Sequence, residues 1–351
     1  MEANIEIAQT LFKQNKYQET IETCNAILAT DNNSIEALKL IAKSFLATRK
    51  IDDARLYLNK VLNINPNDYE VIKDLGNTYQ AIGDLNTAKK YYQTAITINS
   101  SYAPALSNLG GIELNTGNKQ EALTLLIKAT KSDPQLTAAW GNLANCYLQY
   151  GKAKEAEVSI RKAIKINPNL FNSHFLLGII LLGQKKLQEA EQSLRKTIEL
   201  KPDFGIAHFN LGTVLKDLGK LKDAEVYFRK TINLNPGNLT AYKALIEILK
   251  DMNSLDEAEK IIRKAIEKNP SQSFHQYLLS SILISQQQKV ENSFKPFLKV
   301  KTIKIGYKKL EEAELSLRRA IELKPDFAEA HFSLGNLLKD VSRKPEEAEK
   351  S

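Results

Sequence analysis

The sequence predicts an all-α fold, a solenoid of helical hairpins stacked along its 351 residues. Three observations predict it: a proline that recurs every 34 residues, apolar residues spaced three and four apart, and small residues alternating with bulky ones. A fixed period marks a repeat protein whose units bury their apolar faces against their neighbours. The length would otherwise suggest two globular domains, but the period indicates one continuous array.

The proline closes each unit, because it cannot continue a helix. It recurs at Pro66, Pro134, Pro168, Pro202, Pro236 and Pro270, and Ser100 takes its place once. Counting back from these positions, units begin near residues 1, 35, 69, 103, 137, 171, 205, 239 and 273, and an incomplete tenth begins near residue 328.

The unit that ends at Pro236 shows the internal plan. Residues 205–218 and 221–234 each carry apolar residues at helical spacing. Gly219 lies between them, where a tight turn between two helices favours a positive φ. Each unit is therefore predicted to be a helical hairpin. Small residues in both helices alternate with bulky ones, as close packing of the pair requires. The small residues include Gly76, Gly110 and Gly212 in first helices and Ala88, Ala122 and Ala224 in second helices, and the bulky residues of the second helices include Tyr92, Leu126 and Phe228.

This pattern resembles the tetratricopeptide repeat. One unit follows the family pattern almost throughout, with Trp140, Leu143, Ala144, Tyr147, Gly151, Ala156, Ile160, Ala163 and Pro168. The resemblance covers nearly the whole chain and implies a right-handed superhelical solenoid of 34-residue hairpins. It says little about the ligand, since a fold does not name one.

The ninth unit departs from the period. Pro270 and Pro325 are 55 residues apart, 21 more than one period, and the surplus at residues 288–308 holds six lysines and one glutamate. Residues 298–305 are rich in β-branched side chains, which favours a strand over a helix. Three interpretations stay open: an exposed loop, a basic docking segment, and a scar of recombination, since residues 190–215 and 313–338 are near-copies. The expected organisation is an array over 1–287, a basic insertion over 288–308, and the rest of the ninth unit with an incomplete tenth over 309–351.

Composition limits the function. The net charge is +8, of which the insertion supplies +5, so the remaining array is too weakly basic to indicate nucleic-acid binding. Cys24 and Cys146 match no metal or redox spacing and suit a reducing compartment. Neither a signal peptide nor an apolar run long enough for a membrane is visible. A cytoplasmic protein with no membrane partner is expected, and the oligomeric state stays open.

The sequence offers no catalytic or metal site. His174, His208 and His331 occupy one repeat position, which indicates packing roles, and they lack the closely spaced partners of a zinc site. The second helices carry arginines at Arg161, Arg195, Arg229, Arg263 and Arg318, each four residues after a glutamate. This spacing predicts ion pairs within one helix rather than a nucleic-acid surface. We therefore expect a non-enzymatic protein without cofactors or metals.

The groove lined by the first helices is the candidate binding site. Its inner positions are enriched in asparagine, at Asn77, Asn108, Asn142, Asn145, Asn210 and Asn336. An asparagine amide offers both donors and an acceptor, the complement of a peptide group. This is similar to the asparagine ladder inside the tetratricopeptide superhelix of O-GlcNAc transferase. The alternative is that asparagine is simply common at these positions, and the row breaks at Leu176 and Ile179.

The first part of the groove also resembles a carboxylate clamp. Lys73, Asn77 and Asn108 match its first three positions, but Ala138 and Asn142 stand where a lysine and an arginine would complete it. Lys39 and Lys43 add positive charge, which favours acidic peptides. The predicted groove residues are therefore Lys39, Lys43, Lys73, Asn77, Asn108, Asn142, Asn145 and Asn210.

We expect a scaffold that binds an extended peptide or protein segment in this groove. The alternative is the substrate-recognition arm of an enzyme, such as a glycosyltransferase, whose catalytic domain is absent from this chain. An array without a polar final helix favours the alternative, because solenoids need a cap.

Overall fold

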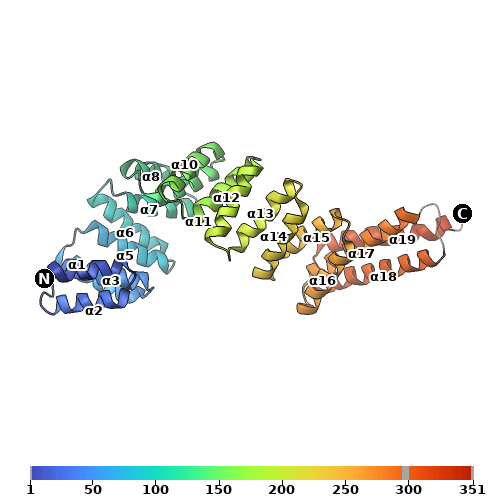
Figure 1. Cartoon of the computed structure of the whole chain (residues 1–351), viewed down its shortest axis with the longest axis horizontal. Coiled ribbons are helices and arrows are strands. Elements are labelled where there is room, and N and C mark those ends of the chain that lie inside the picture. Colours follow the sequence, from blue (N-terminus) through green and yellow to red (C-terminus); the bar gives the residue numbers. More distant parts are fainter. Residues whose placement is uncertain (1, 295–299, 349–351) are drawn as a thin grey trace. The chain divides into compact units, whose positions relative to one another are not determined.

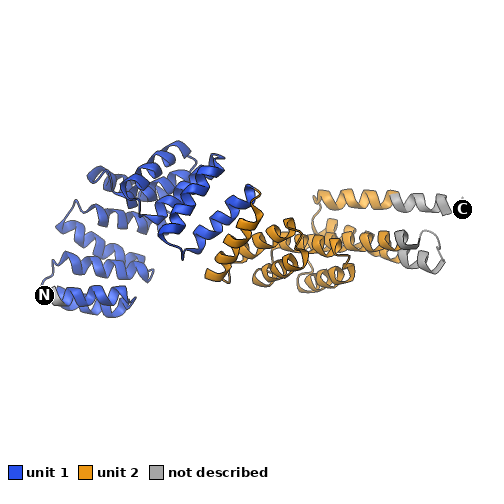
Figure 2. Cartoon of the chain, turned by 45° about the horizontal axis from the view of Figure 1, so that its top comes forward, with its two compact units in different colours: residues 1–184 blue, residues 185–351 orange. Residues whose placement is uncertain are grey.

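The computed structural model describes the backbone of residues 2–294 and 300–348, and the side chains of residues 4–290 and 308–339. The described residues form nineteen helices and no strand (Figure 1). The chain divides into two compact units, residues 1–184 and 185–351 (Figure 2). The prediction of an all-α fold made of helical hairpins is confirmed.

Unit 1 contains five hairpins and one further helix. Each helix packs against the next along the chain, and α1 also contacts α3, as α7 contacts α9. The helices are α1 (Glu2–Lys13), α2 (Tyr17–Leu28), α3 (Ile35–Ala47), α4 (Ile51–Ile64), α5 (Tyr69–Ala81), α6 (Leu85–Ile98), α7 (Ala103–Asn115), α8 (Lys119–Ser132), α9 (Thr137–Gln149), α10 (Ala153–Ile166) and α11 (Phe171–Gly183).

Unit 2 follows the same plan, and α15 also contacts α17. Its helices are α12 (Leu187–Leu200), α13 (Gly205–Asp217), α14 (Leu221–Leu234), α15 (Leu239–Asp251), α16 (Leu255–Lys268), α17 (Ser273–Phe294), α18 (Val300–Leu323) and α19 (Ala328–Ala348).

In the first eight repeats, the turn after the first helix contains a left-handed residue at one repeat position. Four of these residues are glycines, including Gly219 with φ of 74°, as the sequence predicts. The other four are Asn15, Arg49, Lys185 and Asn253, with φ between 58° and 61°. The turn therefore recurs even where the sequence shows no glycine, because the packed helices on either side fix its geometry.

The predicted alternation of small and bulky residues is confirmed inside the hairpins. A Cβ atom added to Gly76 would lie 2.6 Å from the Tyr92 ring, and one added to Gly212 would lie 2.8 Å from the Phe228 ring. Tyr92 and Phe228 are fully buried. The two helices approach so closely that only a residue without a side chain fits.

The ion pairs predicted within the second helices of the hairpins are confirmed, and two of their arginines also join one hairpin to the next. Arg229 binds Glu225 on its own helix and Glu257 of the next hairpin, each at 2.8 Å. Arg263 likewise binds Glu259 at 2.8 Å and Glu312 at 2.6 Å. The sequence spacing predicted the first contact of each pair, and only stacking produces the second.

The insertion lengthens two helices instead of forming a strand. Helices α17 and α18 are 22 and 24 residues long. Residues 300–305 belong to α18, so the strand prediction is wrong there, and residues 298–299 lie outside the described residues. The loop interpretation is likewise wrong for 288–294 and 300–308, which are helical. Continuing two packed helices satisfies the backbone hydrogen bonds, and this outweighs a local strand preference.

Helix α19 is a single helix of 21 residues. The sequence predicted an incomplete tenth unit here, and the period of the repeat would place a turn and the beginning of a second helix near its end. At residue 342, the position equivalent to Gly219, the chain carries a serine and the helix continues. The prediction of a second helix there is wrong, because α19 continues through this position to Ala348.

Candidate functional site

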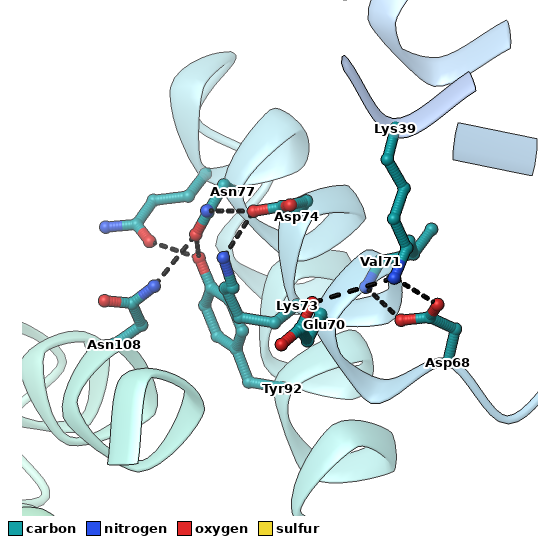
Figure 3. A network of polar contacts seen from close by, with 10 residues as sticks. Lys39, Asp68, Glu70, Val71, Lys73, Asp74, Asn77, Tyr92 and Asn108 are labelled. Carbon is teal, nitrogen blue, oxygen red and sulfur yellow. Dashed lines mark hydrogen bonds and ion pairs between the residues drawn. The ribbon is translucent and has the colours of Figure 1, made fainter. Parts of the chain in front are cut away.

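Lys39 on α3 lies in an ion-pair cluster with the first turn of the next hairpin (Figure 3). Its Nζ lies 2.6 Å from Asp68 Oδ2 and 3.6 Å from Glu70 Oε2. Asp68 also caps α5, because its Oδ1 accepts a hydrogen bond from the Val71 N–H at 3.1 Å. Burial disfavours the charged form of Lys39, but the hydrogen bond and charge of Asp68 outweigh it and raise the pKa of the ammonium. Lys39 is thus a charged residue that already has a partner.

Lys73, Asn77 and Asn108 come together, as the clamp resemblance implies (Figure 3). Lys73 pairs with the neighbouring carboxylate of Asp74. Asn77 donates to Asp74 at 3.2 Å, and its Oδ1 accepts a hydrogen bond from the Asn108 amide at 2.8 Å. These side chains therefore hold one another, and a ligand carboxylate at Lys73 would have to displace Asp74.

Tyr92 closes this network from the second helix of the hairpin. Its hydroxyl lies 2.8 Å from Asn77 Oδ1 and 2.7 Å from Gln80 Oε1. Burial raises the pKa of Tyr92, so the hydroxyl stays protonated and can donate. Tyr92, whose ring lies beside Gly76, therefore also orients the side chain of Asn77. Lys43, in contrast, is exposed on α3.

A groove of about 490 Å³ lies along α9 and α11. Its polar lining includes Asn142, Asn145 and Asn172, and its apolar lining includes Phe175 and Leu176. Asn142 is held in place because its Nδ2 donates to the backbone oxygen and to the hydroxyl of Ser107, each at 3.2 Å. The groove therefore combines amides with an apolar wall.

Sequence reasoning missed Asn172 and Phe175. Both stand at inner repeat positions, the second and the fifth of their unit, whereas the asparagine row occupies the sixth and the ninth. Leu176 appeared as a break in the row, whereas it lines the groove. Asn210 lies in unit 2, where its Nδ2 donates to the Ile206 carbonyl of its own helix at 2.8 Å.

The recurring histidines make a shared backbone contact. Nε2 lies 2.8 Å from the carbonyl oxygen of the proline six residues earlier in His174, His208 and His331. A carbonyl accepts only, so Nε2 carries the proton. Trp140 makes the same contact with Pro134 at 2.9 Å. The position thus selects a ring N–H, which explains the recurrence without metal binding. Among the described side chains, no group of three or more His, Cys, Asp or Glu residues is arranged to hold a metal.

His275 differs from the other histidines and predicts a pH effect. It is buried, its ring packs edge-on against Tyr242 with centroids 4.8 Å apart, and neither ring nitrogen has a hydrogen-bond partner among the described residues. Burial lowers the pKa of His275 below its ordinary value of 6.5. The folded form therefore excludes a proton that the unfolded form accepts, so stability falls as the pH drops below about 6.5 and levels off below the folded pKa.

We expect the wild type to lose about 1 kcal/mol of unfolding free energy between pH 7.5 and 5.5. Urea unfolding followed by circular dichroism at both pH values measures it. His275→Leu should remove this loss, and His331→Leu, which changes an exposed histidine, should keep it. An equal pH dependence in all three proteins would contradict the prediction.

The part of the chain that the structure describes contains no helix long and apolar enough to cross a membrane.

Two protein-family models match the chain. The family model for the C-terminal domain of cilia and flagella-associated protein 70 matches residues 19–277, and a tetratricopeptide-repeat model matches residues 308–341. No curated protein sequence matches the chain significantly.

Solved structures are similar in fold. PilF of Pseudomonas aeruginosa is 20% identical, with a TM-score of 0.56 over 63% of this chain and 98% of its own. An IFIT1 monomeric mutant with Gppp-AAAA is 18% identical, with a TM-score of 0.56 over 92% of this chain and 71% of its own. The Cut9–Hcn1 structure of the APC/C is 15% identical, with a TM-score of 0.51 over 92% of this chain and 59% of the matched chain. At these identities the likeness concerns the fold alone.

Proposed function

Since this chain belongs to the tetratricopeptide-repeat family represented by the C-terminal domain of cilia and flagella-associated protein 70, we propose that it binds an extended segment of a partner protein in the groove of α9 and α11. Proteins with this fold commonly mediate protein–protein interactions.

The observation that carries the proposal is the pairing of amides with an apolar wall in one groove. An extended peptide leaves backbone N–H and C=O groups without partners, and these must be satisfied when it binds. Ser107 occupies the donors of Asn142, so Asn142 offers its Oδ1 to a peptide N–H. Asn145 and Asn172 are exposed and offer both donors and acceptors. Phe175 and Leu176 supply the apolar surface against which ligand side chains lose their contact with water.

Charge contributes less to this mode than the lysines of the sequence suggest. Lys39 and Lys73 have carboxylate partners, which leaves Lys43 as the exposed lysine of the three. A preference for acidic ligands is therefore expected to be small and to depend on Lys43. In this proposal the chain provides recognition without catalysis, and the same groove would serve a substrate-recognition arm.

Peptide selection tests the groove. Linear peptides are selected from a displayed random library on the wild-type chain, and their affinities are measured by fluorescence anisotropy. The double variant Asn142→Ala/Asn145→Ala should bind them about 10- to 100-fold more weakly, because each lost hydrogen bond contributes about 0.5–1.5 kcal/mol.

Asn210→Ala is the matched control, since this amide binds its own helix in unit 2, and its affinity should equal that of the wild type. Selection of no peptide, or equal affinity in the double variant, would refute the proposed groove.

A further inference from the structure

Two lysines stand at one repeat position in neighbouring hairpins of unit 2. Lys216 on α13 and Lys250 on α15 are one period of 34 residues apart. Each contacts the residue 31 positions later, which lies on the first helix of the next hairpin. These partners are Glu247 and Ser281, which are also one period apart. The two contacts are therefore equivalent and can be compared directly.

The two lysines differ in the charge of their partner. Lys216 Nζ lies 2.9 Å from Glu247 Oε2 and forms an ion pair with it. Lys250 Nζ instead donates to the carbonyl oxygen of Ser281 at 3.0 Å and to its hydroxyl oxygen at 3.1 Å. Among the described residues, no carboxylate pairs with Lys250. A serine thus stands where the equivalent lysine has a carboxylate.

The contacts of Lys250 match an uncharged amine. Ser281 Oγ uses its own proton to donate to the Leu278 carbonyl at 3.0 Å, so towards Lys250 the hydroxyl acts as an acceptor. An ammonium has three N–H donors, whereas the uncharged amine has two N–H donors and a lone pair. The two oxygens of Ser281 satisfy both donors of the amine. The lone pair is then left free to react.

Burial acts in the same direction. Lys250 is partly buried, and removal from water disfavours a charged group that has no counter-ion. This burial lowers the pKa of Lys250 below its ordinary value of 10.5, and the charge of Glu247 on the same helix opposes the effect without cancelling it. At neutral pH a larger share of Lys250 is therefore uncharged than of a lysine in water.

We propose that Lys250 is a nucleophilic amine that small acyl phosphates acylate. The lone pair of Nζ attacks the carbonyl carbon of the acyl phosphate and forms a C–N bond. The C–O bond to the phosphate breaks, the phosphate leaves with the electron pair, and the proton lost by the nitrogen goes to solvent. The product is an uncharged amide. This site lies in unit 2 and does not depend on the function proposed for the groove of α9 and α11.

The surroundings favour an acyl group over a carboxylate formed from CO₂. An amide keeps one N–H, which can still donate to Ser281. A carbamate would instead add a second negative charge near Glu247 in a partly buried place. Because Lys250 is partly buried, a small donor such as acetyl phosphate can reach it more easily than a bulky thioester. Acylation also removes one of the two hydrogen bonds from Lys250 to α17, so it should loosen this contact between hairpins.

Acetyl phosphate is the probe for this reactivity. The full chain is incubated with it at pH 7.5, then unfolded, and the remaining amines are capped with deuterated acetic anhydride. Fragment ions in mass spectrometry give the ratio of light to heavy acetyl groups at each lysine, and hence its rate. We expect Lys250 to react about fivefold faster than Lys216 or more, since Lys216 would have to give up its ion pair with Glu247.

Two variants of similar size separate charge from shape. Ser281→Glu gives Lys250 the carboxylate that Lys216 has, and it should slow acetylation of Lys250 by about fivefold or more. Ser281→Gln adds a side chain of the same length without the charge, and it should keep the rate within about threefold of the wild type. Circular dichroism checks that both variants fold, as expected at a partly exposed position. Equal rates at Lys250 in the two variants would overturn the proposal.

The pH profile is a test that needs no variant. Nα-acetyl-lysine in the same reaction supplies a free amine with a pKa of about 10.4. The rate of Lys250 relative to this amine should fall as the pH rises from 7.5 to 9.5, because the free amine gains more of its uncharged form over that range. A constant ratio, or a Lys250 that reacts no faster than Lys216 at pH 7.5, would overturn the proposal.

Discussion

Replacing Lys89 with methionine is expected to destabilise unit 1 by about 3 kcal/mol, because it leaves a carboxylate buried without its cation. That carboxylate is Glu113 on α7, which is 1% exposed. Its Oε1 lies 2.5 Å from Lys89 Nζ on α6, and its Oε2 accepts a hydrogen bond from Asn118 at 2.6 Å. The cluster joins one hairpin to the next, so its loss should weaken their interface.

The pH dependence of this cluster has a definite sign. Burial raises the pKa of Glu113, but the hydrogen bonds from Lys89 and Asn118 outweigh burial and bring the pKa below its ordinary value of 4.5. The stabilisation is therefore fully present above about pH 4.5 and is lost as the pH falls through the folded pKa.

The fluorescence of Trp140, the only tryptophan of the chain, reports the urea unfolding of unit 1. The double variant Lys89→Met/Glu113→Leu should recover most of the loss, because it removes both charges together. A single variant as stable as the wild type would show that water or another group already neutralises Glu113.

Phe228→Ala is expected to destabilise unit 2 by about 3–5 kcal/mol, the usual cost of removing a buried aromatic ring. Phe228 is 1% exposed and lies between Phe209 and Gly212. Its removal opens a cavity that α13 and α14 cannot close without moving apart. Because repeats are stabilised by their neighbours, the hairpin should then open as a local unit.

Hydrogen exchange read by mass spectrometry measures this opening separately for each helix. Protection should fall by at least a hundredfold in α13 and α14 and by less in α17. Phe332→Ala is the matched control, since this ring is 72% exposed, and it should change stability by less than about 0.5 kcal/mol. Equal effects of the two substitutions would contradict the packing described for α14.

The groove shows how far sequence patterns reach into the site. The repeat register predicted which positions face inward, and Asn142 and Asn145 do line the groove. The register could not predict the partners of these side chains. Tyr92 of α6 binds Asn77 of α5 because the packing of the two helices places its hydroxyl 2.8 Å from the amide oxygen, and the sequence contains no distance between helices.

The sequence by itself determined the helices, their hairpin pairing and the close contacts of glycine with bulky residues, because these depend on spacing within one repeated unit. The tertiary structure alone decided which lysines are paired, that the insertion extends α17 and α18, and that α19 leaves a face open. Each of these outcomes depends on which neighbour is present and how near it lies. A periodic sequence gives α13 and α19 nearly the same residues, and only stacking determines that Gly212 is covered and Gly335 is not.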